Sequence, residues 1–143
     1  IMDKKSNVHM YVIGATNKPW ALDLPFIRRF QKRIYIPPPS YASRLQMFKL
    51  FAADLNLSSD VRLEELSRAA EGFSGSDILD ICQSAQLKVS GELFESGLAK
   101  NRQAKPRPLN MDDFSEVFKT RKPSIAHDTL ILYEKWFNTF KAL

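Results

Sequence analysis

Residues 33–48 read RIYIPPPSYASRLQMF and contain the sharpest change of pattern in the chain. The first four have the composition of a short strand, and the three consecutive prolines after them stop any regular element. Beyond the prolines the apolar spacing becomes helical, with Ser40 as a good N-cap. The apolar stripe of this helix consists of Tyr41, Leu45, Phe48, Ala52 and Leu55. We therefore expect the prolines to separate a small α/β part from a helical part.

The sequence before this stretch predicts the edge of a buried sheet. Residues 8–14, VHMYVIG, are β-prone and carry too many apolar residues for one wet face, which favours a strand buried on both sides. Farther along, Asp23 is placed to cap a short helix with Pro25 in its first turn. Residues 33–36 then form the second expected strand.

The sequence after it predicts further helices. One is expected near residues 63–70, stopping at Gly72, and the next begins at Ser74, which stands at capping-box spacing from Asp77. The core face of that second helix is expected to hold Ile78, Ile81, Cys82, Ala85 and Val89. Residues 96–109 are basic and contain two prolines, so they are expected to form an exposed connection.

Two helices are expected beyond this connection. The first starts at Asn110 or Met111, cannot pass Pro123, and buries Phe114, Val117 and Phe118. The second starts at Ser124 or Ala126 and carries Leu130, Tyr133, Phe137 and Phe140 on one stripe. Trp136 is expected to be exposed beside that stripe and to dock onto another surface. The fold class predicted for the whole chain is α+β.

Length and composition limit the possible classes of protein. The chain has 143 residues, 44% of them hydrophobic, which is enough for one compact body plus a remnant of something larger. No apolar run approaches the ~18 residues of a membrane span, so a cytoplasmic protein is expected. With a single cysteine, Cys82, and two histidines, disulfide and metal-cluster chemistry are improbable.

The charge is segregated along the chain. Residues 1–58 hold 9 basic and 3 acidic side chains, residues 59–98 hold 3 and 8, and residues 99–143 hold 9 and 5. An acidic block between two basic blocks suits a protomer that meets copies of itself or an anionic ligand at one edge. A dedicated nucleic-acid module would more often carry a continuous basic stripe. Ordinary solvated faces remain an equal alternative.

No complete catalytic machinery is visible in the sequence. There is no phosphate-binding G-x-x-x-x-G-K-[ST] loop and no arrangement of nucleophile and histidine above chance. Three polar groups remain as candidates. Asn17 follows the first expected strand, where α/β sheets present side chains to ligands. Arg28 and Arg29 follow a short helix, and residues 74–77 form a bare helix N-terminus.

Several runs together resemble one family, the AAA ATPases of the meiotic clade, over nearly the whole chain. Those runs are residues 13–20, 22–23, 27–30, 32–37, 71–78, 113–114 and 122–124. The likeness is greatest to the vacuolar-protein-sorting type that disassembles ESCRT-III, with the katanin and spastin severing enzymes next. It implies the C-terminal edge of the AAA large α/β domain over residues 1–37, the helical lid, a four-helix bundle, over 38–123, and a C-terminal helix over 124–143 that packs back on the large domain.

The resemblance implies catalytic roles for three residues. Asn17 would be sensor 1, an amide that orients the attacking water near the γ-phosphate, although a structural cap at a strand end is the alternative. Arg28 and Arg29 would be arginine fingers that reach the nucleotide of the neighbouring protomer. Taken alone, a double arginine is usually a solvated face.

The resemblance also implies an adenine-side wall. Gly75 and Ser76 match the position where the backbone passes close to the base, and Phe51 aligns nearby, although simple core packing is the more favoured reading of Phe51. Arg33 is expected to make a structural ion pair. Arg62 stands where the family often has Asp, and residues 96–109 replace a β insertion of eukaryotic members, which suggests an archaeal relative or another branch.

The implied cofactors are ATP and Mg²⁺, the latter bound by a part that precedes this sequence, so the chain is expected to be inactive alone. The implied assembly is a homo-hexamer that acts on an ESCRT-III-like protein polymer, with membrane association only through that substrate and no nucleic acid. A microtubule-severing ATPase and a non-catalytic lid or interaction module are the alternatives.

Overall fold

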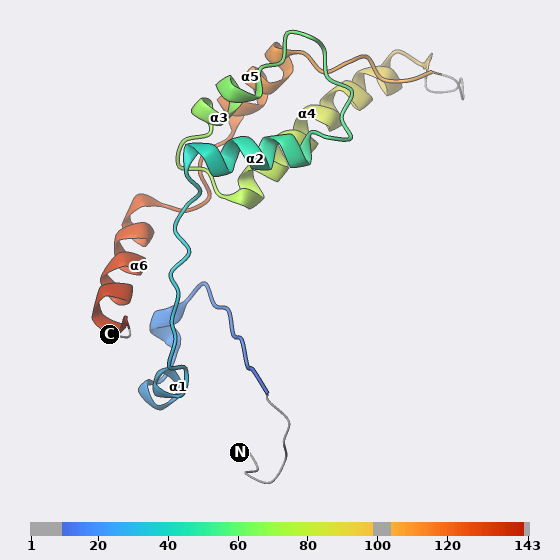
Figure 1. Cartoon of the computed structure of the whole chain (residues 1–143). Helices are drawn as coiled ribbons and strands as arrows, with labels where there is room; N and C mark the ends of the chain where they lie inside the picture. The colour runs from blue at the N-terminus through green and yellow to red at the C-terminus, as the bar shows by residue number, and fades with distance from the viewer. Residues whose placement is uncertain (1–9, 99–103, 142–143) are drawn as a thin grey trace. The chain divides into compact units, whose positions relative to one another are not determined.

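A computed structural model describes residues 10–98 and 104–141 (Figure 1). The chain divides into two compact units: Ile36–Leu130, named the lid unit below after the domain that the resemblance predicts there, and a second unit that joins the residues up to Tyr35 with those from Ile131 onward. The elements are the 3₁₀ helix η1 (Pro19–Ala21), α1 (Leu24–Arg29), α2 (Tyr41–Phe51), α3 (Leu63–Ala69), α4 (Gly75–Glu95), α5 (Met111–Thr120) and α6 (His127–Phe140). No helix in the described ranges is long and apolar enough to cross a membrane.

The lid unit is a helical bundle built by α2, α3, α4 and α5. All five residues expected on the core face of α4 are buried, as are Phe48 of α2, Leu66 of α3 and Phe114 of α5. Ser40 caps α2 by accepting from the Ser43 backbone N–H at 3.3 Å, and capping boxes start both α4 and α5. Gly72 has φ +81° in the turn after α3, a conformation that favours glycine, so its expected helix-stopping role is confirmed.

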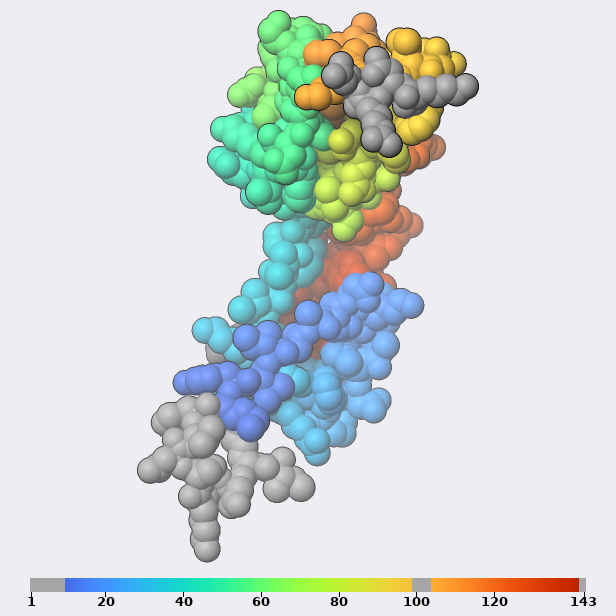
Figure 2. Space-filling model, turned by 90° about the vertical axis from the view of Figure 1, so that its right-hand side faces the viewer, coloured from blue at the N-terminus to red at the C-terminus, as the bar shows by residue number. Residues whose placement is uncertain are grey.

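The connection before α5 is fixed to the loop between α2 and α3. Leu109 is buried, its N–H donates to the Asn56 carbonyl at 2.8 Å, and its own carbonyl accepts from the Ser58 N–H at 2.8 Å. Figure 2 shows these two segments, orange and green, side by side on the surface. Residues 96–109 were expected to be exposed, but the last of them, Leu109, is buried and hydrogen-bonded to the loop between α2 and α3.

The buried face of α2 differs from the expected stripe. Tyr41 remains 39% exposed, and Arg44 is buried in the interior instead. Its Nε donates to the Ser67 carbonyl and its Nη1 to the Pro39 carbonyl, both at 2.9 Å. A guanidinium can replace an apolar residue here because backbone carbonyls satisfy it, which apolar spacing cannot reveal.

The two expected strands are not formed in the described residues. Residues 10–14 and 33–36 are extended but join no ladder, and Ile13 and Ile36 are 94% and 85% exposed. The first two residues of the expected strand, 8 and 9, lie outside the described ranges. A β-strand needs a neighbouring strand to pair its backbone groups, and none is present in the part of the chain that the structure describes.

In the second unit, aromatic rings hold α6 against η1 and the extended segment that contains Tyr35. Tyr133 packs on Trp20 with ring centroids 5.1 Å apart, and Phe137 packs on Tyr35 at 5.7 Å. Trp136, expected to be exposed, is half-buried and packs on Phe140 at 5.2 Å. Three residues of the predicted α6 stripe, Tyr133, Phe137 and Phe140, thus make aromatic contacts within this unit.

Candidate functional site

Asn17 lies at a bend between an extended segment and η1. Its backbone carbonyl accepts a hydrogen bond from the Tyr133 hydroxyl of α6, which fixes the position of the residue. Its side-chain amide is exposed and has no hydrogen bond to another described residue. The geometry therefore holds Asn17 by its backbone and leaves the amide open to a ligand. Sequence reasoning missed Tyr133, which it treated only as part of an apolar stripe.

Arg28 and Arg29 are the last two residues of α1. Ile27, only 5% exposed, anchors this short helix, and both arginines are exposed to solvent. Within the described ranges neither guanidinium makes a hydrogen bond or an ion pair. Two unpaired, adjacent forks of donors can bind phosphate oxygens, because each presents several N–H groups in one plane.

Gly75 and Ser76 form the start of α4 in the lid unit. Ser76 is exposed and Gly75 half-buried, and a Cβ built on Gly75 would lie 3.6 Å from the side chain of Met47, an ordinary contact. Packing alone therefore does not require glycine here. Met47 lies four residues before Phe51 on α2, and the sequence analysis did not single it out as a neighbour of Gly75. Residues spaced by four lie on one face of a helix, so this spacing could have placed Met47 beside Phe51.

Phe51 packs against the lid core and is half-buried. This contact agrees with the core interpretation weighed for it. Cys82 is also a core residue: it is 2% exposed, and burial raises the pKa of its thiol to about 11.

Asp77 closes the first turn of α4 and reaches beyond it. Its Oδ2 accepts from the N–H and hydroxyl of Ser74 at 2.8 and 2.9 Å, and from those of Ser124 at 3.2 and 3.1 Å. Burial acts to raise the pKa of this carboxyl, but the hydrogen bonds from both serines hold it below its ordinary value. Asp77 is therefore a charged acceptor shared by the helix cap and a distant segment.

A hollow of about 320 Å³ lies in the second unit beside residues 14–16. Phe26, Phe30 and Trp136 line it, and Arg33 stands in its wall. The Nε of Arg33 is buried without a hydrogen-bond partner. The structural ion pair expected for Arg33 is thus not found within the described part of the chain.

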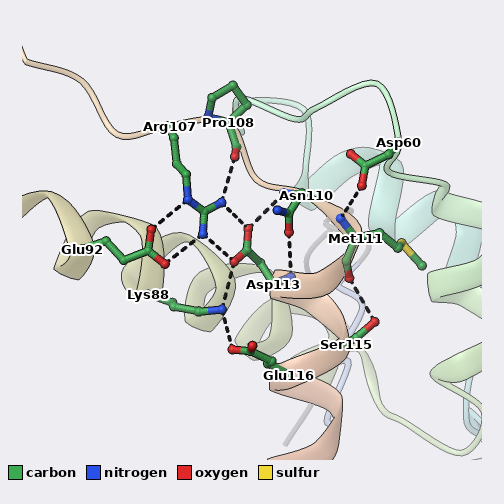
Figure 3. Close-up of polar contacts among 10 residues, drawn as sticks. All are labelled: Asp60, Lys88, Glu92, Arg107, Pro108, Asn110, Met111, Asp113, Ser115 and Glu116. Atoms are coloured by element: carbon green, nitrogen blue, oxygen red, sulfur yellow. Dashed lines mark hydrogen bonds and ion pairs between the residues drawn. The ribbon is translucent and has the colours of Figure 1, made fainter.

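A cluster of charged side chains, shown in Figure 3, links α4, α5 and the segment just before α5. The Asp113 side chain, 2% exposed, accepts from the Nη1 and Nη2 of Arg107 at 2.7 and 2.8 Å and from the Nζ of Lys88 at 3.0 Å. Arg107 also pairs with Glu92 and Lys88 with Glu116. The Arg107 hydrogen bonds hold the pKa of Asp113 well below its usual range. Every charge has a partner, so the cluster is structural.

The exposed residues can bind phosphate groups. The Asn17 amide and the Arg28 and Arg29 guanidinium groups, which have no partner among the described residues, are donors suited to phosphate oxygens. In the described ranges, no group of three or more His, Cys, Asp or Glu side chains that could hold a metal ion occurs.

Comparison with known proteins defines the family. Residues 60–116 match the model of the AAA+ lid domain, and residues 96–140 match that of the Vps4 C-terminal oligomerisation domain. Together with the relatives below, these matches fit a C-terminal portion of an AAA ATPase of the meiotic clade, which the sequence motifs indicate.

Three relatives illustrate the range of similarity. Cell division protein C of Sulfolobus acidocaldarius is 43% identical over 143 residues, which is 100% of this chain and 37% of that protein. Spastin of Naegleria gruberi is 35% identical, with 97% and 28% covered. The human katanin p60 ATPase of the A-like 1 type is 34% identical, with 90% and 27% covered. The chain thus spans well under half of the length of these relatives.

Solved structures confirm the fold. The FIGL-1 AAA domain in complex with ADP superposes with a TM-score of 0.79 at 28% identity, covering 91% of this chain and 44% of that one. A structure on katanin self-assembly gives 0.75 at 28% identity, covering 84% and 44%. The chain therefore has the fold of the corresponding part of these AAA domains.

Proposed function

We propose that the protein containing this chain is an ATPase that assembles as a homo-hexamer and couples ATP hydrolysis to the disassembly of protein polymers. The observation that carries the proposal is the pair Arg28 and Arg29 at the end of α1, which is exposed and makes no ion pair with another residue in the described part of the chain. The Vps4-type oligomerisation match and the archaeal cell-division relative support a ring and an ESCRT-III-like filament as substrate. Cytoplasmic action, with membranes reached only through the substrate, belongs to the same proposal.

Each site residue has one role in this proposal. The Asn17 amide orients the attacking water near the γ-phosphate, and Arg28 and Arg29 reach the nucleotide of the neighbouring protomer, where they stabilise the charge of the departing phosphoryl group. Gly75 and Ser76 pass their backbone along the adenine base. When bound, Mg²⁺ neutralises phosphate charge, and its ligands belong to residues outside this sequence.

The division of labour follows the domains. We propose that residues 1–37 are the edge of the large α/β domain, 38–123 the lid and 124–143 the C-terminal helix. The two compact units, with boundaries near Tyr35 and Leu130, support this division without fixing its residues. Phe51 contributes to the lid core, with the base as a secondary contact.

The double substitution Arg28→Gln, Arg29→Gln in the full-length protein tests the proposal. ATP hydrolysis should fall by at least ~10³-fold, because arginine fingers contribute that much in comparable enzymes, while nucleotide affinity stays within a few-fold. Arg68→Gln on α3, another exposed arginine, should leave turnover unchanged. Full turnover by the double variant would remove these residues from the active site.

A second candidate function is the severing of microtubules, favoured by the katanin and spastin relatives. Both polymers can be offered to the full-length protein with ATP, and loss of polymer followed by light scattering. Disassembly of microtubules but not of ESCRT-III-like filaments would select this candidate. A full-length protein without ATPase activity would instead favour the non-catalytic module.

A further inference from the structure

We propose that the outer face of the second half of α4 is the surface of the lid unit on which a second copy of this chain docks. The surface, called the outer stripe below, consists of Leu87, Gly91 and Phe94 on α4 and of Leu98 just beyond its end. The inference rests on the proposed function, which requires a ring of protomers. It adds to that function the lid surface by which neighbours meet.

The first observation is that α4 carries apolar residues on two opposite faces. Leu87 lies two residues from both Ala85 and Val89 of the buried core face, which places it about 200° around the helix, on the side away from the core. Phe94 follows Leu87 by seven residues and so lies on the same side. Leu87, Phe94 and Leu98 are 71%, 73% and 60% exposed. A helix that is apolar on both sides is typical of one that is covered on both sides.

The second observation is that the outer stripe has room for a partner. Gly91 lies between Leu87 and Phe94, and a Cβ built on it would meet no neighbouring atom of the described residues within 4 Å. Glycine destabilises a helix interior, and the packing of the lid does not require it here. Beside the stripe lies a hollow of about 200 Å³, whose wall includes Gln86 and Ser90 of α4. Exposed apolar side chains next to a hollow are typical of surfaces that bind proteins.

Two further observations favour another copy of the chain as the occupant. The match to the Vps4 C-terminal oligomerisation domain covers residues 96–140 and therefore begins at the end of the outer stripe. The stripe also belongs to the acidic block, residues 59–98, with 3 basic and 8 acidic side chains, whereas residues 1–58 hold 9 and 3. Two stripes that faced each other would bring like charges together, and contact with the basic block of a neighbour joins opposite charges. The charges thus favour a head-to-tail contact, as a ring requires.

Assembly of the full-length protein tests the inference. The double substitution Leu87→Gln, Phe94→Gln removes the apolar side chains of the stripe, and the lid should keep its stability because both positions are exposed and glutamine is a good helix former. Analytical ultracentrifugation with a non-hydrolysable ATP analogue gives the protein concentration of half-assembly. It should rise at least ~10-fold, since an apolar side chain of this size contributes about that factor when it leaves water.

Leu50→Gln is the matched control, because Leu50 is 70% exposed and lies on α2, outside the outer stripe. It should change the concentration of half-assembly by no more than about twofold, as exposed substitutions do. Gly91→Gln is a second test variant. It replaces the helix glycine by a better helix former in open space, so the lid stays folded, yet the added side chain should obstruct a neighbour that packs over the stripe.

Thermal unfolding followed by circular dichroism checks that the lid is intact in each variant. If the double variant and Gly91→Gln assembled at the wild-type concentration, the inference would be overturned, whatever other protein the stripe binds, and the proposed function would stand. An effect of Leu50→Gln as large as that of the double variant would also overturn it. A full-length wild type that stays monomeric would instead refute the proposed hexamer.

Discussion

Asp113 is the most strongly held carboxylate in the described residues. It is almost fully buried, accepts from Arg107, Lys88 and the Asn110 backbone N–H, and has a pKa well below the ordinary 3.8. Burial acts against the charged form, so the hydrogen bonds more than offset it. Removing the charge would leave the Arg107 and Lys88 cations without their buried partner.

We therefore predict that Asp113→Asn lowers the free energy of unfolding of the lid by about 3 kcal/mol, the usual cost of breaking a buried charge pair. Native-state hydrogen exchange of the α4 and α5 amides in the full-length protein measures it. Glu92→Gln is the control, because Glu92 is an exposed partner of Arg107 and its loss should cost below about 1 kcal/mol. Equal effects of the two substitutions would show that burial of Asp113 contributes nothing.

The same residue predicts a pH dependence. Its pKa is lower in the folded lid than in the unfolded chain, so its stabilisation is fully present above about pH 4, near the unfolded pKa, and is lost as the pH falls toward the folded pKa. The wild-type lid should lose stability below about pH 4 more steeply than Asp113→Asn. Circular dichroism can follow acid unfolding of the wild type and of Asp113→Asn. Equal loss of stability with falling pH in the two proteins would contradict this prediction.

At the scale of elements, Arg44 joins the proline run to α3. Its side chain reaches both the Pro39 and Ser67 carbonyls, and the Ser67 hydroxyl donates to the Tyr41 carbonyl at 3.0 Å. We predict that Arg44→Leu costs the lid about 2 kcal/mol, since the buried Ser67 carbonyl and the partly buried Pro39 carbonyl lose their donor. Arg68→Leu, at an exposed position of α3, should stay within about 0.5 kcal/mol. Hydrogen exchange of the α2 and α3 amides measures the stability change in both variants. If the stability of the Arg44→Leu lid equalled that of the wild type, water would have to replace the guanidinium as the donor to the two carbonyls.

Helices were predictable and strands were not, for a physical reason. The starts of α2, α4 and α5 are encoded locally by Ser40, Ser74 and Asn110, each of which caps its own helix. A strand depends on a distant neighbour, so the β-prone residues 10–14 remain extended and unpaired here.

The same distinction applies to the candidate site. Asn17, Arg28 and Arg29 were found from local motifs, and their assignment stays a prediction. The bonds of Asp77 to Ser124 and of Tyr133 to Asn17 join residues 47 and 116 positions apart. Such contacts follow from the tertiary fold and leave no periodic signal in the sequence.

At the scale of the whole molecule, the proposed site is shared between protomers. In the proposed function, Asn17 serves the nucleotide of its own protomer, whereas Arg28 and Arg29 serve that of the neighbour. Such a head-to-tail contact gives a ring when the rotation between neighbours closes, and every interface of the proposed hexamer then combines different parts of two copies. In a ring of this kind, substitution of Asn17 impairs one side of each interface, and substitution of Arg28 and Arg29 impairs the other side.

Mixing two inactive variants of the full-length protein should therefore restore hydrolysis. Protomers with Arg28→Gln and Arg29→Gln keep Asn17, and protomers with Asn17→Ala keep both arginines. In random rings from equal amounts, about a quarter of the interfaces join an intact Asn17 to intact arginines, so about a quarter of wild-type turnover is expected. Steady-state phosphate release from co-expressed, doubly tagged rings measures it. If the arginines acted within their own protomer, no interface would be complete and the mixture would stay as inactive as each variant alone.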